Sequence, residues 1–184
     1  MPELYVQFLQ IMRNAKLVAL SAISAAFATI FLTIGNWFTS FSLSGAFMAS
    51  LCIMLPLSKK SYKSALLTYL AALLLSGVFS GFFTRWDALF PFAVFAGLHP
   101  IANNFVADKG INKILALAVK DVWFVGALLL TQLLTRIYVG ENEFLNEYIY
   151  PILLVAGAVF FPLYDYVAGT FQRSVDIIIK RLKL

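Results

Sequence analysis

The sequence predicts an all-α membrane protein, a bundle of six transmembrane helices in a single domain over residues 1–184, with both termini cytoplasmic. Hydrophobic residues make up 61% of the chain and charged residues only 12%, whereas a soluble domain carries about 25% charged residues. Apolar runs of about 20 residues, the length that crosses a bilayer, recur along nearly the whole chain. Basic residues gather at one end of these runs, which is the third observation behind the prediction.

The helices are placed by the length of each apolar run and by the turn residues between runs. They are expected near 16–35, 41–57, 64–83, 89–106, 113–136 and 149–171. The second is close to the lower limit of about 17 residues and contains Pro56, and the fourth is interrupted by Pro100. A five-span arrangement therefore stays open. Pro162 is expected to bend the sixth helix.

Two segments flank the predicted spans. Near the N-terminus, one face of a short interfacial helix is formed by Leu4, Tyr5, Phe8, Leu9 and Met12. The C-terminal VDIIIKRLKL is apolar and basic, which suits the surface of an anionic inner leaflet. An extension of the neighbouring helix or a frayed tail explains each segment equally well.

The distribution of basic residues predicts the orientation of the bundle. Of the 14 Lys and Arg residues, only Arg85 and Arg136 lie at the end opposite the termini, and Lys120 lies within a span. Because basic residues concentrate in cytoplasmic loops, both termini are expected in the cytoplasm. The acidic loop GENEFLNEY, which contains Glu141, then faces outward.

Four ionisable residues lie within the predicted spans: His99, Lys120, Asp121 and Asp165. His99, Lys120 and Asp165 all lie about 10 Å from the cytoplasmic ends of their helices, at about 1.5 Å per residue. This common depth permits an ion pair between Lys120 and Asp165, with His99 in the same layer. Asn103 follows His99 by four residues and shares its helix face. The layer either fixes the register of the helices or acts on a ligand, a proton or a partner.

The sequence does not predict an enzyme. Phe95 and His99 form FxxxH, and His99 and Asn103 form HxxxN, which are fragments of the CAAX-type intramembrane endopeptidase pattern. The adjacent glutamate pair and the second histidine of that pattern are missing, so no catalytic metal site is expected. The single cysteine, Cys52, excludes a disulfide within the chain. No nucleotide-binding motif occurs and no cofactor is expected.

Small residues line one face of the first predicted helix at Ala15, Ala19, Ala22 and Ala26. Such a stripe allows another helix to approach closely, either from the same bundle or from a partner. In the third predicted helix, Gly77 and Gly81 form a GxxxG motif among serines, which is expected to pack within the bundle.

With six spans, cytoplasmic termini and these alanines, the chain resembles the substrate-capture S components of energy-coupling-factor vitamin transporters. The segment FPFAVFAGLHPI also resembles a phenylalanine-rich run followed by GxxP in S-component-like membrane proteins. The resemblance implies that two alanine pairs, Ala15 with Ala19 and Ala22 with Ala26, dock onto a transmembrane coupling subunit that two cytoplasmic ATPase subunits drive. It also implies a multi-pass protein of a bacterial cell membrane that captures a small water-soluble vitamin at its outer face.

The outer end offers aromatic, charged and amide side chains for such a ligand. The candidates are Asn36, Trp37, Arg85, Trp86, Asp87, Arg136 and Glu141. Aromatic faces stack on planar rings, and arginines bind carboxylate or phosphate groups. The same residues also suit the aromatic belt and the loops that membrane proteins carry at their interfaces.

Two other functions stay open. A non-catalytic scaffolding or accessory protein of cell-envelope synthesis would have the polar layer and the small-residue stripes without an outer pocket. A small independent transporter would use His99, Lys120 and Asp165 as a relay. The net charge of +5 does not indicate nucleic-acid binding, because the basic residues mark the membrane edges.

Overall fold

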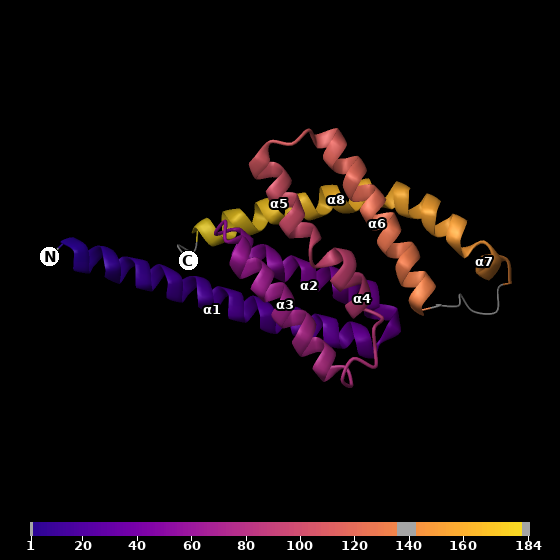
Figure 1. Ribbon diagram of the computed structural model, residues 1–184, viewed down its shortest axis with the longest axis horizontal. Coiled ribbons are helices and arrows are strands. Elements are labelled where there is room, and N and C mark those ends of the chain that lie inside the picture. Colours follow the sequence, from indigo (N-terminus) through magenta and orange to yellow (C-terminus); the bar gives the residue numbers. More distant parts are fainter. Residues whose placement is uncertain (1, 136–142, 182–184) are drawn as a thin grey trace.

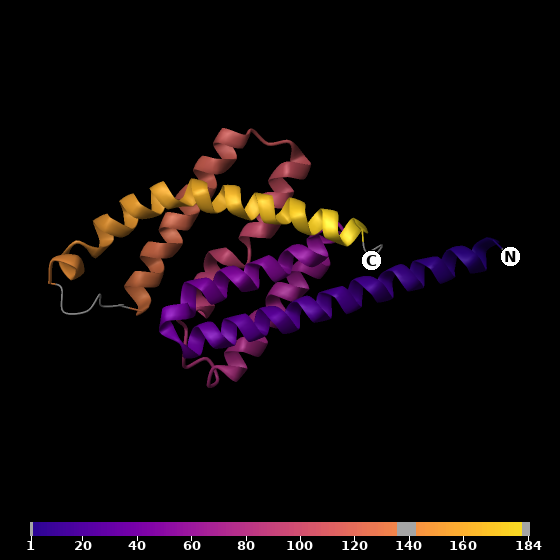
Figure 2. The ribbon, with the colours of Figure 1, turned by 180° about the vertical axis from the view of Figure 1, so that it is seen from behind.

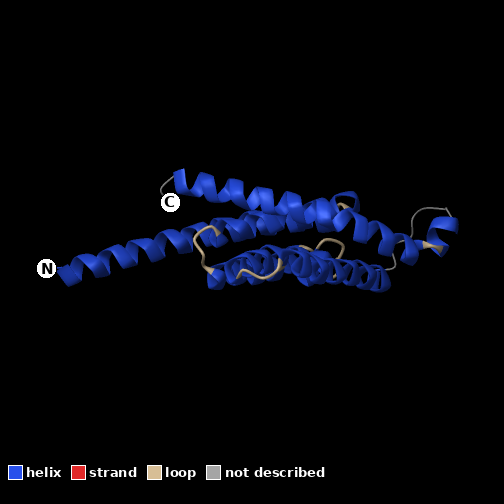
Figure 3. Ribbon diagram, turned by 90° about the horizontal axis from the view of Figure 1, so that it is seen from above, coloured by secondary structure: helices blue, strands red, loops and turns tan. Residues whose placement is uncertain are grey.

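The chain forms helices and no strand over the residues that the computed structural model describes, 2–135 and 143–181 (Figure 3). The elements are α1 (Pro2–Trp37), the 3-10 turn η1 (Thr39–Phe41), α2 (Ser42–Leu57), α3 (Tyr62–Phe79), α4 (Leu89–Pro91), the π-helical η2 (Phe92–Ala96), α5 (His99–Lys109), α6 (Lys113–Thr135), α7 (Glu143–Glu147) and α8 (Ile149–Arg181). Within this described part of the chain, six stretches are long and apolar enough to cross a membrane: Asn14–Trp37, Thr39–Leu57, Tyr62–Phe79, Leu89–Lys109, Lys113–Leu134 and Ile149–Arg181. The predicted six apolar helices are confirmed, and the structure gives no support to a five-span arrangement.

The helices form two groups (Figures 1 and 2). In the first group, α1 packs along both α2 and α3, and in the second, α6 packs along α8. Helix α2 joins the groups because it also contacts α5 and α8. Both ends of the chain lie toward the same end of the molecule, on the left in Figure 1, where α1 extends past the other helices.

Small side chains bring α1, α2 and α3 close together. Buried alanines from all three helices form the core of this group: Ala28, Ala46, Ala49, Ala65 and Ala72. The backbones of α1 and α2 come into close contact at Gly35 and Gly45. A Cβ atom added to Gly45 would lie only 2.7 Å from the carbonyl oxygen of Phe31, so a larger residue cannot fit without a shift. Such close packing is the main driver of helix association in lipid.

The third span ends four residues earlier than expected, at Phe79 instead of 83. Ser80 caps the helix, and Gly81 lies in the following turn with a φ of +76°, a conformation that glycine adopts without strain. The GxxxG motif therefore does not lie on one helix face. Gly77 is buried and packs within the bundle, where the ring of Phe83, which folds back from the turn, covers it.

The fourth span is broken before Pro100 and not at it. The π-helical η2 ends in a turn at Gly97 and Leu98, and Pro100 lies in the first turn of α5, where a missing N–H is tolerated. Gly97 allows this turn to pack against Tyr69, because a Cβ atom there would lie 2.5 Å from the tyrosine ring. The expected kink within a continuous helix is replaced by two short helices that meet at a turn.

Both flanking segments extend the neighbouring helices. Helix α1 is continuous from Pro2, and α8 runs to Arg181 with Pro162 inside it. At about 1.5 Å per residue, α1 is about 54 Å long, which exceeds the hydrocarbon thickness of about 30 Å. The interfacial N-terminal helix is therefore part of α1, and the C-terminal segment is part of α8, which arches along its length in Figure 2.

Candidate functional site

A cluster of four polar side chains lies between α5, α6 and α8. The ammonium of Lys120 lies 2.5 Å from Oδ1 of Asp165 and 2.6 Å from Oδ1 of Asn103. His99 Nε2 lies 2.9 Å from the same oxygen of Asp165, so the imidazole N–H and the ammonium donate to one carboxylate oxygen. The ion pair that equal depth in the membrane predicts between Lys120 and Asp165 is present, and His99 and Asn103 join it. We call these four residues the polar cluster.

Local sequence explains how α5 contributes two members of the polar cluster. His99 is the first residue of α5, and Asn103 follows one turn later on the same face. The His99 ring is fully buried and lies 5.0 to 5.9 Å, between ring centroids, from Phe95, Phe161 and Tyr164. These aromatic rings fix the imidazole and exclude lipid from it.

The members of the polar cluster differ in how far they are buried. The side chain of Lys120 is 8% exposed and that of His99 is 0% exposed, whereas Asp165 keeps 18% of its surface accessible. Both donors, His99 and Lys120, bind Oδ1 of Asp165. No described residue donates a hydrogen bond to the second carboxylate oxygen, Oδ2. The carboxylate therefore offers one free acceptor at the edge of the polar cluster.

A cavity of about 700 Å³ lies beside the polar cluster, between α5, α6 and α8. Asn103, Lys120 and Asp165 line its inner part, and the α5–α6 connection at Gly110 and Ile111 lines its outer part. Its volume falls in the range of about 300–1,000 Å³ that small-molecule sites occupy. We call this space the polar cavity, and its exposed lining residues, at the α5–α6 connection and in the C-terminal half of α8, form its mouth.

The mouth of the polar cavity carries further polar groups. Asn104 donates to Gln172, whose own amide donates to Asp176, at 3.3 and 2.8 Å. Two more basic side chains, Lys113 and Arg173, line the same mouth. Lys120 is paired with Asp165, so the remaining charged groups of the lining are the cations Lys113 and Arg173 and the carboxylate of Asp176. This excess of positive charge favours a solute that carries negative charge.

One buried atom of the polar cluster, His99 Nδ1, has no hydrogen-bond partner among the described residues. Asp121, the fourth ionisable residue of the predicted layer, does not join the polar cluster, and its Oδ1 is likewise buried and unpartnered there. Buried polar atoms are usually hydrogen-bonded, so these groups mark places where water or a solute can bind.

The structure gives Asn36 a structural position at the other end of the bundle. Its amide nitrogen donates to Ser80 Oγ at 2.9 Å, and its carbonyl oxygen accepts from the backbone N–H groups of Ala88 and Leu89. Asn36 is fully buried, so it fixes the turn before α4 and has no surface left for a ligand.

The other described candidates at this end form an exposed group. The guanidinium of Arg85 lies 4.6 Å from the ring centroid of Trp37, and Trp86 lies beside Phe83. Asp87 is half-buried next to them. Arg136 and Glu141 lie outside the described residues.

The alanine stripe of α1 faces away from the rest of the chain. Its four members, Ala15, Ala19, Ala22 and Ala26, are all exposed. The residues that α1 buries against α2 and α3 are others, among them Ser24, Ala28 and Leu32. The stripe is therefore not used for packing among the residues that the structure describes.

Sequence reasoning missed the residues that shape the polar cavity. Asn104, Gln172 and Asp176 read as ordinary polar residues, and only the packing of α5 against α8 brings Asn104 to Gln172. The i, i+4 spacing of Gln172 and Asp176 was an available signal for one of these contacts.

Among the described residues, no group of three or more His, Cys, Asp or Glu side chains is arranged to hold a metal ion. No protein-family model, curated protein or solved structure matches this chain.

Proposed function

We propose that the chain is the solute-binding membrane subunit of an uptake transporter, of the kind that the S components of energy-coupling-factor transporters represent. Its solute is a small water-soluble vitamin or a related micronutrient. The observation that carries the proposal is the polar cluster at the inner end of a 700 Å³ cavity. Buried ionisable groups in a membrane are expensive, and they mark solute or ion pathways when they border a cavity.

The polar cavity supplies the binding chemistry. The free oxygen of Asp165 accepts a hydrogen bond from the solute, while Lys113 and Arg173 at the mouth attract a carboxylate or phosphate group. By the positive-inside rule the termini are cytoplasmic, so the polar cavity opens inward. The exposed group of Trp37, Arg85 and Trp86 then lies at the outer face, where it captures the solute first.

The exposed alanine stripe supports a multi-subunit transporter. Small residues on a lipid-facing helix surface allow close packing against another membrane helix. We propose that Ala15, Ala19, Ala22 and Ala26 dock onto a transmembrane coupling subunit, with two cytoplasmic ATPase subunits supplying the energy. This division of labour fits a chain of a bacterial cell membrane that carries no nucleotide-binding motif.

A thermal-shift screen against a panel of water-soluble vitamins tests solute binding. One member of the panel is expected to raise the unfolding temperature of the purified protein. Asp165→Asn is expected to lower the apparent affinity for that vitamin, obtained from the concentration dependence of the shift, at least tenfold, because the variant loses the charged acceptor. Asp108→Asn is the matched control, because Asp108 is exposed and lies outside the polar cavity. Equal shifts in Asp165→Asn and the unmodified protein would place the solute elsewhere.

A further inference from the structure

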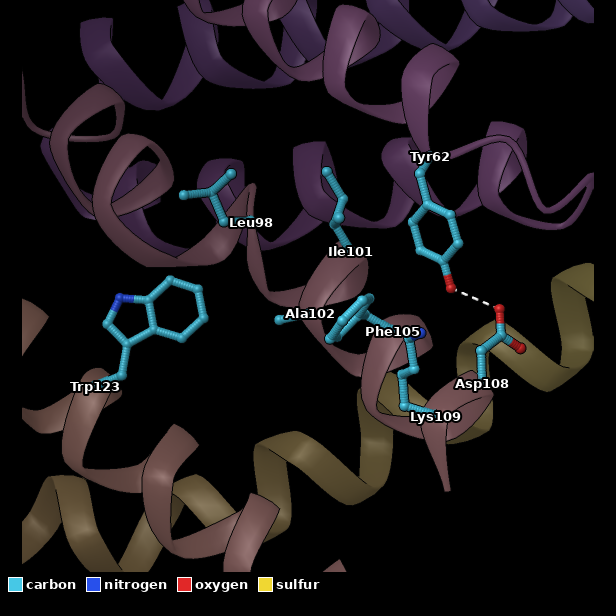
Figure 4. Close-up of a pocket in the computed structure, with 8 residues that line it drawn as sticks. All are labelled: Tyr62, Leu98, Ile101, Ala102, Phe105, Asp108, Lys109 and Trp123. Carbon is cyan, nitrogen blue, oxygen red and sulfur yellow. Dashed lines mark hydrogen bonds between the residues drawn. The ribbon is translucent and has the colours of Figure 1, made fainter. Parts of the chain in front are cut away.

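A second cavity, of about 820 Å³, lies on a different face of α5 (Figure 4). It is bounded by Tyr62 of α3, by Trp123 of α6, and by Leu98 with the α5 side chains Ile101, Phe105 and Lys109. We call it the lateral groove. It shares no lining residue with the polar cavity, so the proposed transport function does not account for it.

The two ends of the lateral groove differ in chemistry, as Figure 4 shows. At one end the walls are the apolar side chains of Leu98 and Trp123, and the indole N–H of Trp123 is already bound to the carbonyl of Val94 at 2.9 Å. At the other end the hydroxyl of Tyr62 donates to Asp108 at 2.6 Å. The lateral groove thus has an apolar interior and one polar end.

The length of the lateral groove matches one leaflet of a bilayer. Its polar end lies at the last turn of α5, at Asp108 and Lys109. Trp123 follows the first residue of α6, Lys113, by 10 positions, which is about 15 Å along a helix. Half of a hydrocarbon core of about 30 Å has the same depth. An acyl chain that enters from the interface can therefore extend along the whole groove.

The charge at the polar end is positive. Lys60 lies 3.3 Å from Asp108, and Lys63 and Lys109 lie within one residue of Tyr62 and Asp108 along the chain. The side chain of Lys60 is 80% exposed, so it keeps most of its donors available. Lys60 pairs with Asp108, and the ammonium of Lys109, a lining residue, lies 5.9 Å from the ring centroid of Phe105. With Lys63 also close by in the chain, this end carries more positive than negative charge, and a phosphate group complements the excess.

We infer that the lateral groove binds an anionic glycerophospholipid of the surrounding bilayer. One acyl chain lies against Ile101, Phe105 and Trp123, and the phosphate lies between Lys60 and Lys109. The inference rests on the depth of the groove and on the charge at its end, and it holds whether or not the chain belongs to a transporter.

Fluorescence quenching tests the inference directly, because Trp123 lines the groove. Replacing Trp37 and Trp86, both at the opposite end, by Phe leaves Trp123 as the single tryptophan. The protein is placed in vesicles of phosphatidylcholine and phosphatidylglycerol in which one of the two lipids is brominated on its acyl chains. Trp123 is expected to be quenched more strongly by brominated phosphatidylglycerol at equal mole fraction.

Two variants separate charge from shape. Lys60→Gln combined with Lys109→Gln is expected to lower the preference for phosphatidylglycerol by about fivefold for each lysine, while Lys180→Gln, at the end of α8, leaves it unchanged. Ala102→Phe fills the groove and is expected to reduce quenching by both lipids. Each variant is checked for folding by circular dichroism.

Two results would overturn the inference. Equal quenching by the two brominated lipids would show that the lysines select no headgroup. Unchanged quenching in Ala102→Phe would show that the acyl chain that reaches Trp123 lies outside the groove.

Discussion

The pairing of Lys120 with Asp165 is the residue-scale feature on which the polar cluster depends. Lys120→Met removes the ammonium and leaves the half-buried carboxylate of Asp165 with His99 as its one strong donor, so we expect a loss of about 3 kcal/mol in stability. Denaturant unfolding in detergent micelles measures this loss. Lys113→Met is the matched control, because Lys113 is exposed at the start of the same helix.

The double variant Lys120→Met with Asp165→Leu checks the coupling. Replacing both charged residues removes the uncompensated carboxylate. The double variant is therefore expected to lose less stability than the two single variants lose together. Strict additivity would contradict a direct interaction between the two side chains.

Asn36 is expected to act on stability and not directly on a ligand. Asn36→Ala leaves the buried N–H groups of Ala88 and Leu89 without their acceptor, which costs about 1–3 kcal/mol. The free energy of unfolding is measured for Asn36→Ala and for Trp37→Ala. The two residues are neighbours in α1, but the side chain of Asn36 is buried and that of Trp37 is exposed. A larger loss for Trp37→Ala than for Asn36→Ala would contradict the structural position of Asn36.

These residues show what the sequence can predict at this scale. Helix rise alone placed His99, Lys120 and Asp165 at one depth, and that is enough to predict their contact. The role of Asn36 could not be predicted, because its partners Ser80 and Ala88 are 44 and 52 residues away in the chain.

Helix α1 presents two different faces, one toward the bundle and one outward. Ala22→Phe adds a bulky ring to the exposed alanine stripe, so we predict that it abolishes copurification with a coupling subunit and leaves thermal stability unchanged. Ile23→Phe is the matched control, because Ile23 is 53% exposed and is turned about 100° around the helix. Copurification of Ala22→Phe at the level of Ile23→Phe would exclude docking through the stripe.

The elements themselves were predictable to different degrees. The apolar length of α6 fixed its extent, but the ends of α3 and the break before α5 depend on tertiary contacts. Phe83 folds back over Gly77, and Gly97 packs against Tyr69, and neither contact has a signal in the local sequence. The spacing of Gly77 and Gly81 suggested a packing motif that the turn at Gly81 does not allow.

At the scale of the whole molecule, composition and basic-residue placement predict a six-helix membrane protein, because the bilayer restricts a chain of this hydropathy to few arrangements. The polar cavity was beyond sequence reasoning. It lies between α5, α6 and α8, and a stretch of apolar sequence does not specify which helices become neighbours.

Native mass spectrometry of the protein, gently solubilised from its own membranes, tests the central claim most directly. A solute-binding subunit is expected to appear in a complex with a larger membrane subunit and two ATPase subunits, and to retain a small molecule that Asp165→Asn loses. The chain alone, without a bound small molecule in any of several detergents, would contradict the proposed function and favour a scaffolding role for the polar cluster.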